Sequence, residues 1–261
     1  MYSKFRVNTG EGYSRCYYDA GKACLEEHKT KIKRKLDQFI DYNTGIIDGS
    51  ALEEELFKEI EADIFLSHSH SDENLAVGFA GWLKTNFNLT AFVDSCVWEY
   101  AENILLEINN RYNVISPKEQ EKKTYSYSKV NYAASHIYLM LNSALNNMIN
   151  KTECFMFLDT EHSCIHMDEE KAPDKTLSPW IYSEIVMANT MKITPPDRLL
   201  VSTEFRHNIS ESLQMTHNLD FSTFIDLSPT DLANWKYKNK VDINPLNTLY
   251  SIKEKGNALN G

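Results

Sequence analysis

The 261-residue sequence lacks the apolar segments that carry proteins into or across membranes. Apolar residues make up 42% of it, yet no run of them approaches the roughly 18 residues of a membrane span. The opening segment, MYSKFRVNTG, has none of the apolar stretch of a secretion signal. Cysteine is scarce: there are five, and no two of them form a Cys-x-x-Cys pair. We therefore expect a soluble cytoplasmic protein with reduced thiols and no membrane partner.

Positive charge is also in short supply. Lysine and arginine number 27 against 37 aspartate and glutamate residues, which gives a net charge of −10. A chain this acidic is not expected to have nucleic acid as its main partner, because such binding depends on neutralising phosphates. The basic run from Lys29 to Lys35 is interpreted as the solvated face of a helix, since acidic stretches flank it.

Several common catalytic signatures are absent. The sequence contains no Gly-x-Gly-x-x-Gly after an apolar run, no P-loop, no Gly-x-Ser-x-Gly and no His-Glu-x-x-His. Nicotinamide redox chemistry, P-loop hydrolysis, serine-hydrolase chemistry and zinc-protease chemistry are therefore not expected.

Short apolar runs alternate with segments of helical spacing from Asp63 onward. The runs have the composition of strands that are buried on both faces of a sheet. Strands that alternate with helices pair in parallel through right-handed crossovers, so the pattern predicts an α/β protein. The predicted strands are residues 63–67, 91–93, 154–158, 198–201 and 223–226.

Residues 1–61 differ from the rest, because their apolar residues recur only at helical spacing. We predict that they form an α-rich N-terminal extension packed on a body made of residues 62–261. Within that body, residues from about 112 to 150 are predicted to be an insertion, in which a polar, Tyr-rich excursion precedes a long helix.

Polar residues follow three of the predicted strands. These are Ser67-His68-Ser69, Asp94-Ser95 and Asp159-Thr160. Ligands of parallel sheets bind outside the carboxyl ends of the strands, so this edge is the place to look for chemistry.

The most specific feature is a helix start, Ser178-Pro-Trp-Ile-Tyr-Ser-Glu184. Trp180 and Glu184 are four residues apart, so they share one face of the helix. A carboxylate beside an aromatic wall can oppose the positive charge that develops when a glycosidic bond breaks. The alternative is a surface glutamate on a helix whose tryptophan packs into the core.

The order of these motifs resembles the Toll/interleukin-1 receptor (TIR) domain family. Asp63-Ile-Phe-Leu-Ser-His-Ser is similar to its first strand, Ala91-Phe-Val-Asp to the strand before its flexible loop, and Trp180-x-x-x-Glu184 to its NAD-cleaving helix. The resemblance extends over about residues 62–237. It implies a flavodoxin-like fold, with a five-stranded parallel sheet and helices on both faces.

Catalytic members of the family break the bond between nicotinamide and ribose in NAD. The resemblance therefore implies NAD as the substrate, no separate cofactor and no metal. Glu184 falls at the position of the essential glutamate. The loop implied at Asp94–Glu102 would cover the substrate. The residues implied for substrate binding are Ser67, His68, Ser69, Asp94, Trp98 and Trp180.

Two further groups of residues carry atoms that can bind ligands. The helix that follows Ser69–Ser71 offers backbone N–H groups to a phosphate, although Asp72 in its first turn opposes this. His162-Ser-Cys164-Ile-His166 contains side chains that bind zinc, but the spacing matches no structural zinc pattern. We interpret it as a loop that lines the cleft or as polar surface.

The additions to a minimal TIR pattern resemble bacterial antiphage-defence members of the Thoeris-like type. The expected activity is that of an NAD glycohydrolase or ADP-ribosyl cyclase, whose diffusible ADP-ribose-type product reaches an effector protein. The protein partner is then this effector or a second copy of the chain. The alternatives are a TIR-like interaction module without catalysis and another N-glycosidase, such as a nucleoside deoxyribosyltransferase.

Overall fold

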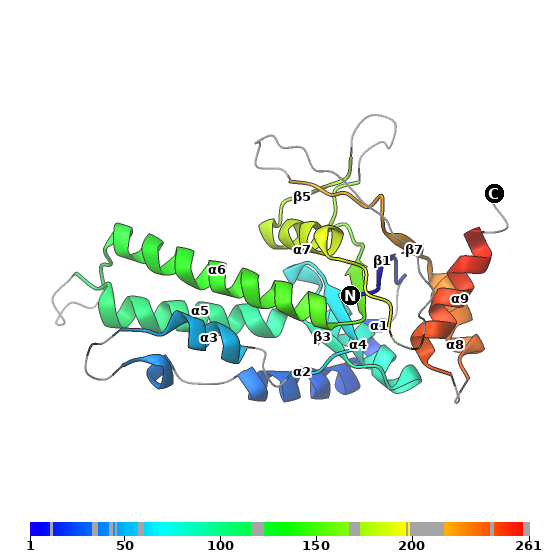
Figure 1. The fold of residues 1–261 in the computed structure, drawn as a ribbon, viewed down its shortest axis with the longest axis horizontal. Coiled ribbons are helices and arrows are strands. Elements are labelled where there is room, and N and C mark those ends of the chain that lie inside the picture. Colours follow the sequence, from blue (N-terminus) through cyan, green and yellow to red (C-terminus); the bar gives the residue numbers. More distant parts are fainter. Residues whose placement is uncertain are drawn as a thin grey trace. The chain divides into compact units, whose positions relative to one another are not determined.

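The chain folds into two compact units, seen here in a computed structural model (Figure 1). The first unit comprises Met1–Cys24, Glu61–Val93 and Ile149–Gly261, and the second comprises Leu25–Ile60 and Asp94–Met148. The described residues are 1–10, 13–32, 36–41, 44, 46–56, 60–115, 123–166, 173–196, 198, 217–240 and 243–257. Among them, no helix is long and apolar enough to cross a membrane.

The elements of the chain follow the alternation expected of an α/β protein. The strands are β1 (Ser3–Val7), β2 (Ile64–Ser67), β3 (Ala91–Val93), β4 (Cys154–Leu158), β5 (Lys175–Thr176), β6 (His217–Asn218) and β7 (Ile225–Leu227). The α-helices are α1 (Tyr13–Cys16), α2 (Tyr18–Ile32), α3 (Gly49–Leu56), α4 (Glu73–Phe87), α5 (Ser95–Tyr112), α6 (Tyr127–Lys151), α7 (Pro179–Thr190), α8 (Pro229–Lys238) and α9 (Pro245–Asn257). Two 3₁₀ turns, η1 (Leu36–Phe39) and η2 (His70–Asp72), complete them.

Five strands of the first unit form an all-parallel sheet in the order β3-β2-β4-β1-β7. The predicted α/β class with a five-stranded parallel sheet is thus confirmed. Counted from β2, the order begins 2-1-3, as in flavodoxin-like sheets. The N-terminal strand β1 occupies the next position, where that fold has its fourth strand.

The N-terminal strand corrects the predicted organisation of the chain. Residues 1–61 were assigned to an α-rich extension, but Ser3–Val7 lies within the sheet and pairs with both β4 and β7. In the predicted strand at 198–201, Arg198 lies outside the strands and the other residues lie outside the described part. Most of the residues predicted as an insertion at about 112–150 belong to the second unit, together with α5.

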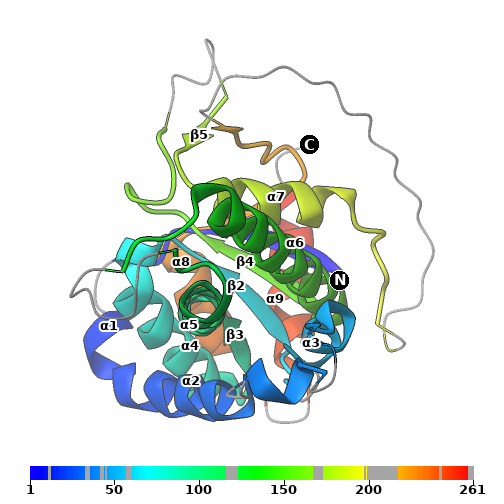
Figure 2. The same ribbon diagram turned by 90° about the vertical axis from the view of Figure 1, so that its left-hand side faces the viewer.

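The side chains of β1 alternate between the two faces of the sheet, which is why no continuous apolar run marks this strand. Phe5 is fully buried, and its ring stacks on Tyr250 of α9 with the centroids 6.2 Å apart. Lys4 and Arg6 occupy the other face, where Lys4 Nζ donates to Asn189 Oδ1 of α7 at 2.7 Å. Helices therefore cover both faces, with α9 on one and α7 on the other (Figure 2).

Helices α2 and α4 cross at a pair of glycines within the first unit. A Cβ on Gly21 would lie 1.8 Å from the carbonyl oxygen of Val77, and one on Gly81 would lie 2.0 Å from that of Tyr17. These distances are too short for any side chain, so the close crossing requires glycine at both positions.

We predict that Phe5→Ala destabilises the protein by about 3–5 kcal/mol, because it leaves a cavity at a fully buried site in the middle of the sheet. Urea denaturation followed by circular dichroism measures the change. Tyr237→Ala is the control, since its side chain on α8 is 89% exposed and its loss should change stability by less than about 0.5 kcal/mol. Equal stabilities of the two variants would contradict the placement of β1.

Candidate functional site

The carboxyl end of β2 and the start of α7 bring two predicted site residues together. Ser67 is the last residue of β2, and Glu184 lies in the second turn of α7. The helix begins as the sequence indicates: Ser178 Oγ accepts a hydrogen bond from the backbone N–H of Ile181 at 3.3 Å, and Pro179 occupies the first turn.

Ser67 Oγ donates a hydrogen bond of 2.6 Å to Glu184 Oε2. Both side chains are buried, with exposed fractions of 0% for Ser67 and 1% for Glu184. Burial of a carboxylate costs free energy unless hydrogen bonds compensate for the lost water. The bond therefore stabilises Glu184 at this position and ties α7 to the end of a central strand.

The other predicted substrate-binding residues in the first unit differ in how far they are buried. His68 follows Ser67 directly and is 5% exposed, whereas Ser69 is half-buried. Trp180 is half-buried as well and lies one turn before Glu184 on α7. Its side chain is therefore partly accessible to solvent.

The predicted substrate-covering loop is largely helical. Asp94 is buried directly after β3, and α5 begins at the next residue. Both belong to the second unit. Trp98 falls within α5, and its side chain lies outside the described part of the chain.

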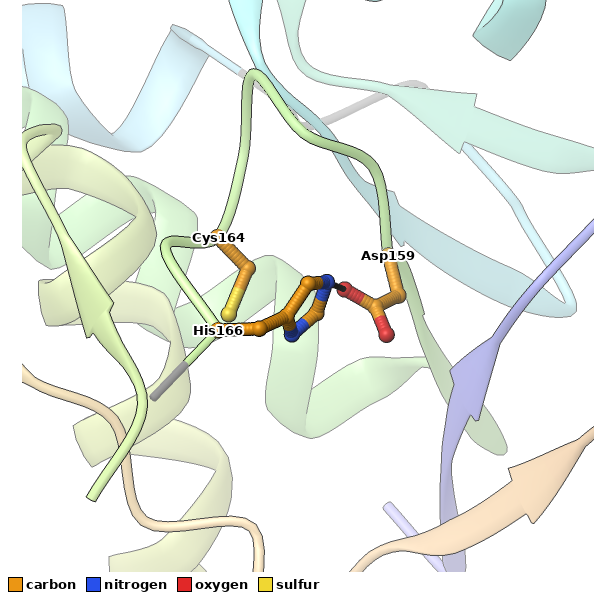
Figure 3. A group of neighbouring side chains, drawn as sticks. All are labelled: Asp159, Cys164 and His166. Atoms are coloured by element: carbon orange, nitrogen blue, oxygen red, sulfur yellow. Dashed lines mark ion pairs between the residues drawn. The ribbon is translucent and has the colours of Figure 1, made fainter. Parts of the chain in front are cut away.

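A second group of polar side chains lies at the carboxyl end of β1. The sequence pointed to three of its members as candidates, but not to their gathering around Arg6 and Asp174. We call it the Arg6 cluster; its members are Arg6, Asp159, Cys164, His166 and Asp174. Arg6 Nε donates to Asp159 Oδ2 at 2.8 Å, and Arg6 Nη2 donates to Asp174 Oδ2 at 2.8 Å. Figure 3 shows Asp159, Cys164 and His166 pointing toward one another.

Charge shapes the chemistry of the Arg6 cluster. Burial lowers the pKa of Arg6, but the carboxylates of Asp159 and Asp174 outweigh it and raise that pKa overall. Burial and the same two carboxylates raise the pKa of the Cys164 thiol to about 12. At neutral pH Cys164 is therefore a protonated thiol, which is a poor nucleophile.

The two groups lie on the same face of the sheet. Ser67 of β2 is in register with Phe157 of β4, and Phe157 is in register with Arg6 of β1. Parallel neighbours in register point to the same side, so Ser67 and Arg6 are two strands apart at one edge. Polar side chains from the ends of β2, β4 and β1 thus lie along one edge of the sheet.

Asp72 lies at the N-terminus of α4 and binds the loop that follows β4. Its Oδ2 accepts from Thr160 Oγ1 at 2.6 Å, and its Oδ1 lies 2.9 Å from His162 Nδ1. A carboxylate thus occupies the end of the helix that was considered for phosphate binding. This position weighs against an anion at the same helix end.

The second unit contains a pocket of its own, with a volume of about 660 Å³. It is mainly apolar, and several of its aromatic and aliphatic side chains are exposed, among them Ile46 (66%), Tyr112 (39%) and Tyr132 (69%). Exposed apolar side chains gathered in this way are typical of contact surfaces for other molecules.

Comparison with models of protein families, with curated proteins and with solved structures finds no match to this chain.

We predict that the Asp72–His162 pair depends on pH. The hydrogen bond and the charge of Asp72 raise the pKa of His162 above its usual 6.5. The stabilisation that the pair contributes is therefore complete below the ordinary pKa and is lost as the pH rises through the raised value. NMR titration should show the pKa of His162 falling in Asp72→Asn.

An unchanged His162 titration in Asp72→Asn would contradict the pairing.

Proposed function

We propose that the chain is a TIR-like enzyme that cleaves the nicotinamide–ribose bond of NAD. The single observation that supports this best is the buried carboxylate of Glu184, held by Ser67 at the carboxyl end of a parallel sheet. The resemblance to TIR domains implies the same residue on the same helix.

The proposed chemistry needs only one carboxylate. Nicotinamide leaves the cationic pyridinium of NAD as a neutral molecule, so no general acid has to protonate it. The enzyme must oppose the positive charge that develops on the ribose, and Glu184 would do so. Because Ser67 Oγ binds Oε2, the carboxylate is oriented in advance and pays little reorganisation cost in the transition state.

Trp180 would provide an aromatic face for the substrate. Its side chain is half-buried and lies one helical turn from Glu184. Stacking on nicotinamide or adenine would orient the ring without supplying charge. We assign it a role in binding rather than in bond cleavage.

Access to Glu184 places a condition on the proposed activity. The side chain is 1% exposed, so NAD reaches it only when the surrounding segments move apart. A closed resting state suits an enzyme whose uncontrolled activity would deplete a cell of NAD. We therefore propose activation during phage infection in the cytoplasm, with an ADP-ribose-type product as the signal to an effector protein.

A second candidate is a TIR-like module that assembles with other proteins and has no catalytic role. The exposed apolar side chains of the second unit favour it, because such surfaces are common at interfaces. The two candidates differ in a direct way: only the enzyme consumes NAD, and only the enzyme depends on the charge of Glu184.

We predict that Glu184→Gln lowers the rate of NAD cleavage by at least about 100-fold and preserves the fold, because glutamine keeps the shape and loses the charge. Nicotinamide release from NAD is measured by chromatography with the purified protein. Cellular NAD is measured in phage-infected bacteria that express it. A deoxynucleoside and a free base are assayed in parallel, to detect base exchange by a deoxyribosyltransferase.

Glu161→Gln is the matched control, since Glu161 is an exposed glutamate of the same unit, and it should keep wild-type activity. Wild-type turnover by folded Glu184→Gln would sink the assignment. So would unchanged NAD in both the purified assay and the infected cells.

We predict that Trp180→Ala lowers NAD cleavage by no more than about tenfold, the usual contribution of one aromatic contact. Thermal melting of the variant should stay close to that of wild type because the side chain is only half-buried. Loss of the cooperative melting transition would show instead that Trp180 is a core residue.

A further inference from the structure

We propose that three members of the Arg6 cluster form a binding site for a divalent transition metal, with Zn²⁺ as the best fit. The ligand atoms would be Asp159 Oδ1, Cys164 Sγ and His166 Nε2. The proposal is independent of the NAD-cleaving function.

The three residues already gather their donor atoms at one place. Asp159, Cys164 and His166 each offer one ligand atom, and all of these atoms lie within 4.8 Å of one another (Figure 3). Tetrahedral zinc requires donor atoms about 3–4 Å apart, as follows from bond lengths of about 2.0–2.3 Å. A side-chain adjustment of about 1 Å therefore completes the geometry.

The donor set and its setting also suit the metal. One thiolate, one imidazole and one carboxylate are all common zinc ligands. Asp159 Oδ1 is shielded from solvent and accepts no hydrogen bond from the described residues, although His166 Nε2 lies 3.3 Å away at ion-pair distance. A buried carboxylate oxygen that lacks a hydrogen-bond donor is a position where a cation is favoured.

Asp174 supplies the support that metal-binding histidines usually have. His166 Nδ1 lies 3.6 Å from Asp174 Oδ2. When Nε2 binds the metal, the imidazole proton sits on Nδ1 and is donated to this carboxylate, which fixes the orientation of the ring. Arg6 Nη2 gives up its 3.0 Å contact with Nδ1 and keeps its bond to Asp174, while Arg6 Nε keeps its bond to Asp159.

The charges of the site balance when a divalent ion binds. Without the ion, two carboxylates face one guanidinium and Cys164 is counted as an ordinary neutral thiol, which leaves one negative charge. Binding releases the thiol proton to solvent, so the thiolate adds a second negative charge and the ion adds two positive ones. The result is a neutral, half-buried site, and Arg6 removes the excess charge that a third anion would otherwise leave.

The metal would cross-link the segment that follows β4, because all three ligands lie within residues 159–166. Asp159 comes directly after β4, and Cys164 and His166 flank Ile165, which bridges to Lys175 of β5. Three protein ligands leave the fourth position of a tetrahedral ion for water or another small donor.

Cobalt titration tests the proposal on the full-length protein, because Co²⁺ replaces Zn²⁺ and reports its ligands by colour. Reduced protein, stripped of metal with a chelator, should bind one equivalent of Co²⁺. The complex should show a thiolate-to-cobalt charge-transfer band and the intense visible bands of tetrahedral cobalt, and one equivalent of Zn²⁺ should abolish both. Cys164→Ser should lose the charge-transfer band, whereas Cys16→Ser, at an exposed free cysteine, should keep it.

Two further variants separate metal binding from folding. His166 has a side chain that is 52% exposed, so His166→Ala should fold normally and still lose stoichiometric cobalt binding. Asp174→Asn should keep the band and weaken affinity by about 10–100-fold. Absence of the thiolate band in folded wild-type protein, or its survival in Cys164→Ser, would overturn the proposal.

Discussion

The parallel pairing of β1 with β4 on one side and β7 on the other is the constraint on which the first unit depends. It joins the two ends of the chain, because a strand that begins at Ser3 bridges two strands that begin at Cys154 and Ile225. The pairing buries Phe5 under α9 and carries Arg6 to the carboxyl edge. Both the packing around Phe5 and the Arg6 cluster therefore depend on the five residues of β1.

The carboxylates at this edge of the sheet differ in their burial and in the group that binds them. Glu184 is enclosed and bound by the neutral hydroxyl of Ser67, whereas Asp159 and Asp174 are partly exposed and paired with the guanidinium of Arg6. The proposed NAD cleavage uses the carboxylate that a hydroxyl binds, and the proposed metal site uses one of the carboxylates that Arg6 binds.

Glu184 is closed to solvent, whereas the second unit has exposed apolar side chains. Glu184 must become accessible before any substrate reaches it, and loop or lid movement commonly provides such access in enzymes. The second unit presents a pocket and exposed aromatic side chains in its own right. A partner that binds there would give the chain an interaction surface distinct from its proposed catalytic edge.

The sequence by itself determined the alternating α/β pattern, the strands β2, β3, β4 and β7 to within two residues at either end, and the capped start of α7 with Trp180 and Glu184 on one face. These features are local, because apolar runs, N-caps and helical spacing are written in neighbouring residues. Tertiary structure alone decided that Ser3–Val7 enters the sheet and that Ser67 binds Glu184. It also decided that Arg6 meets Asp159 and Asp174, more than 150 residues away. Alternating polar and apolar residues in β1 become a strand only when both neighbours supply hydrogen bonds and both faces supply partners, and no short stretch of sequence contains that information.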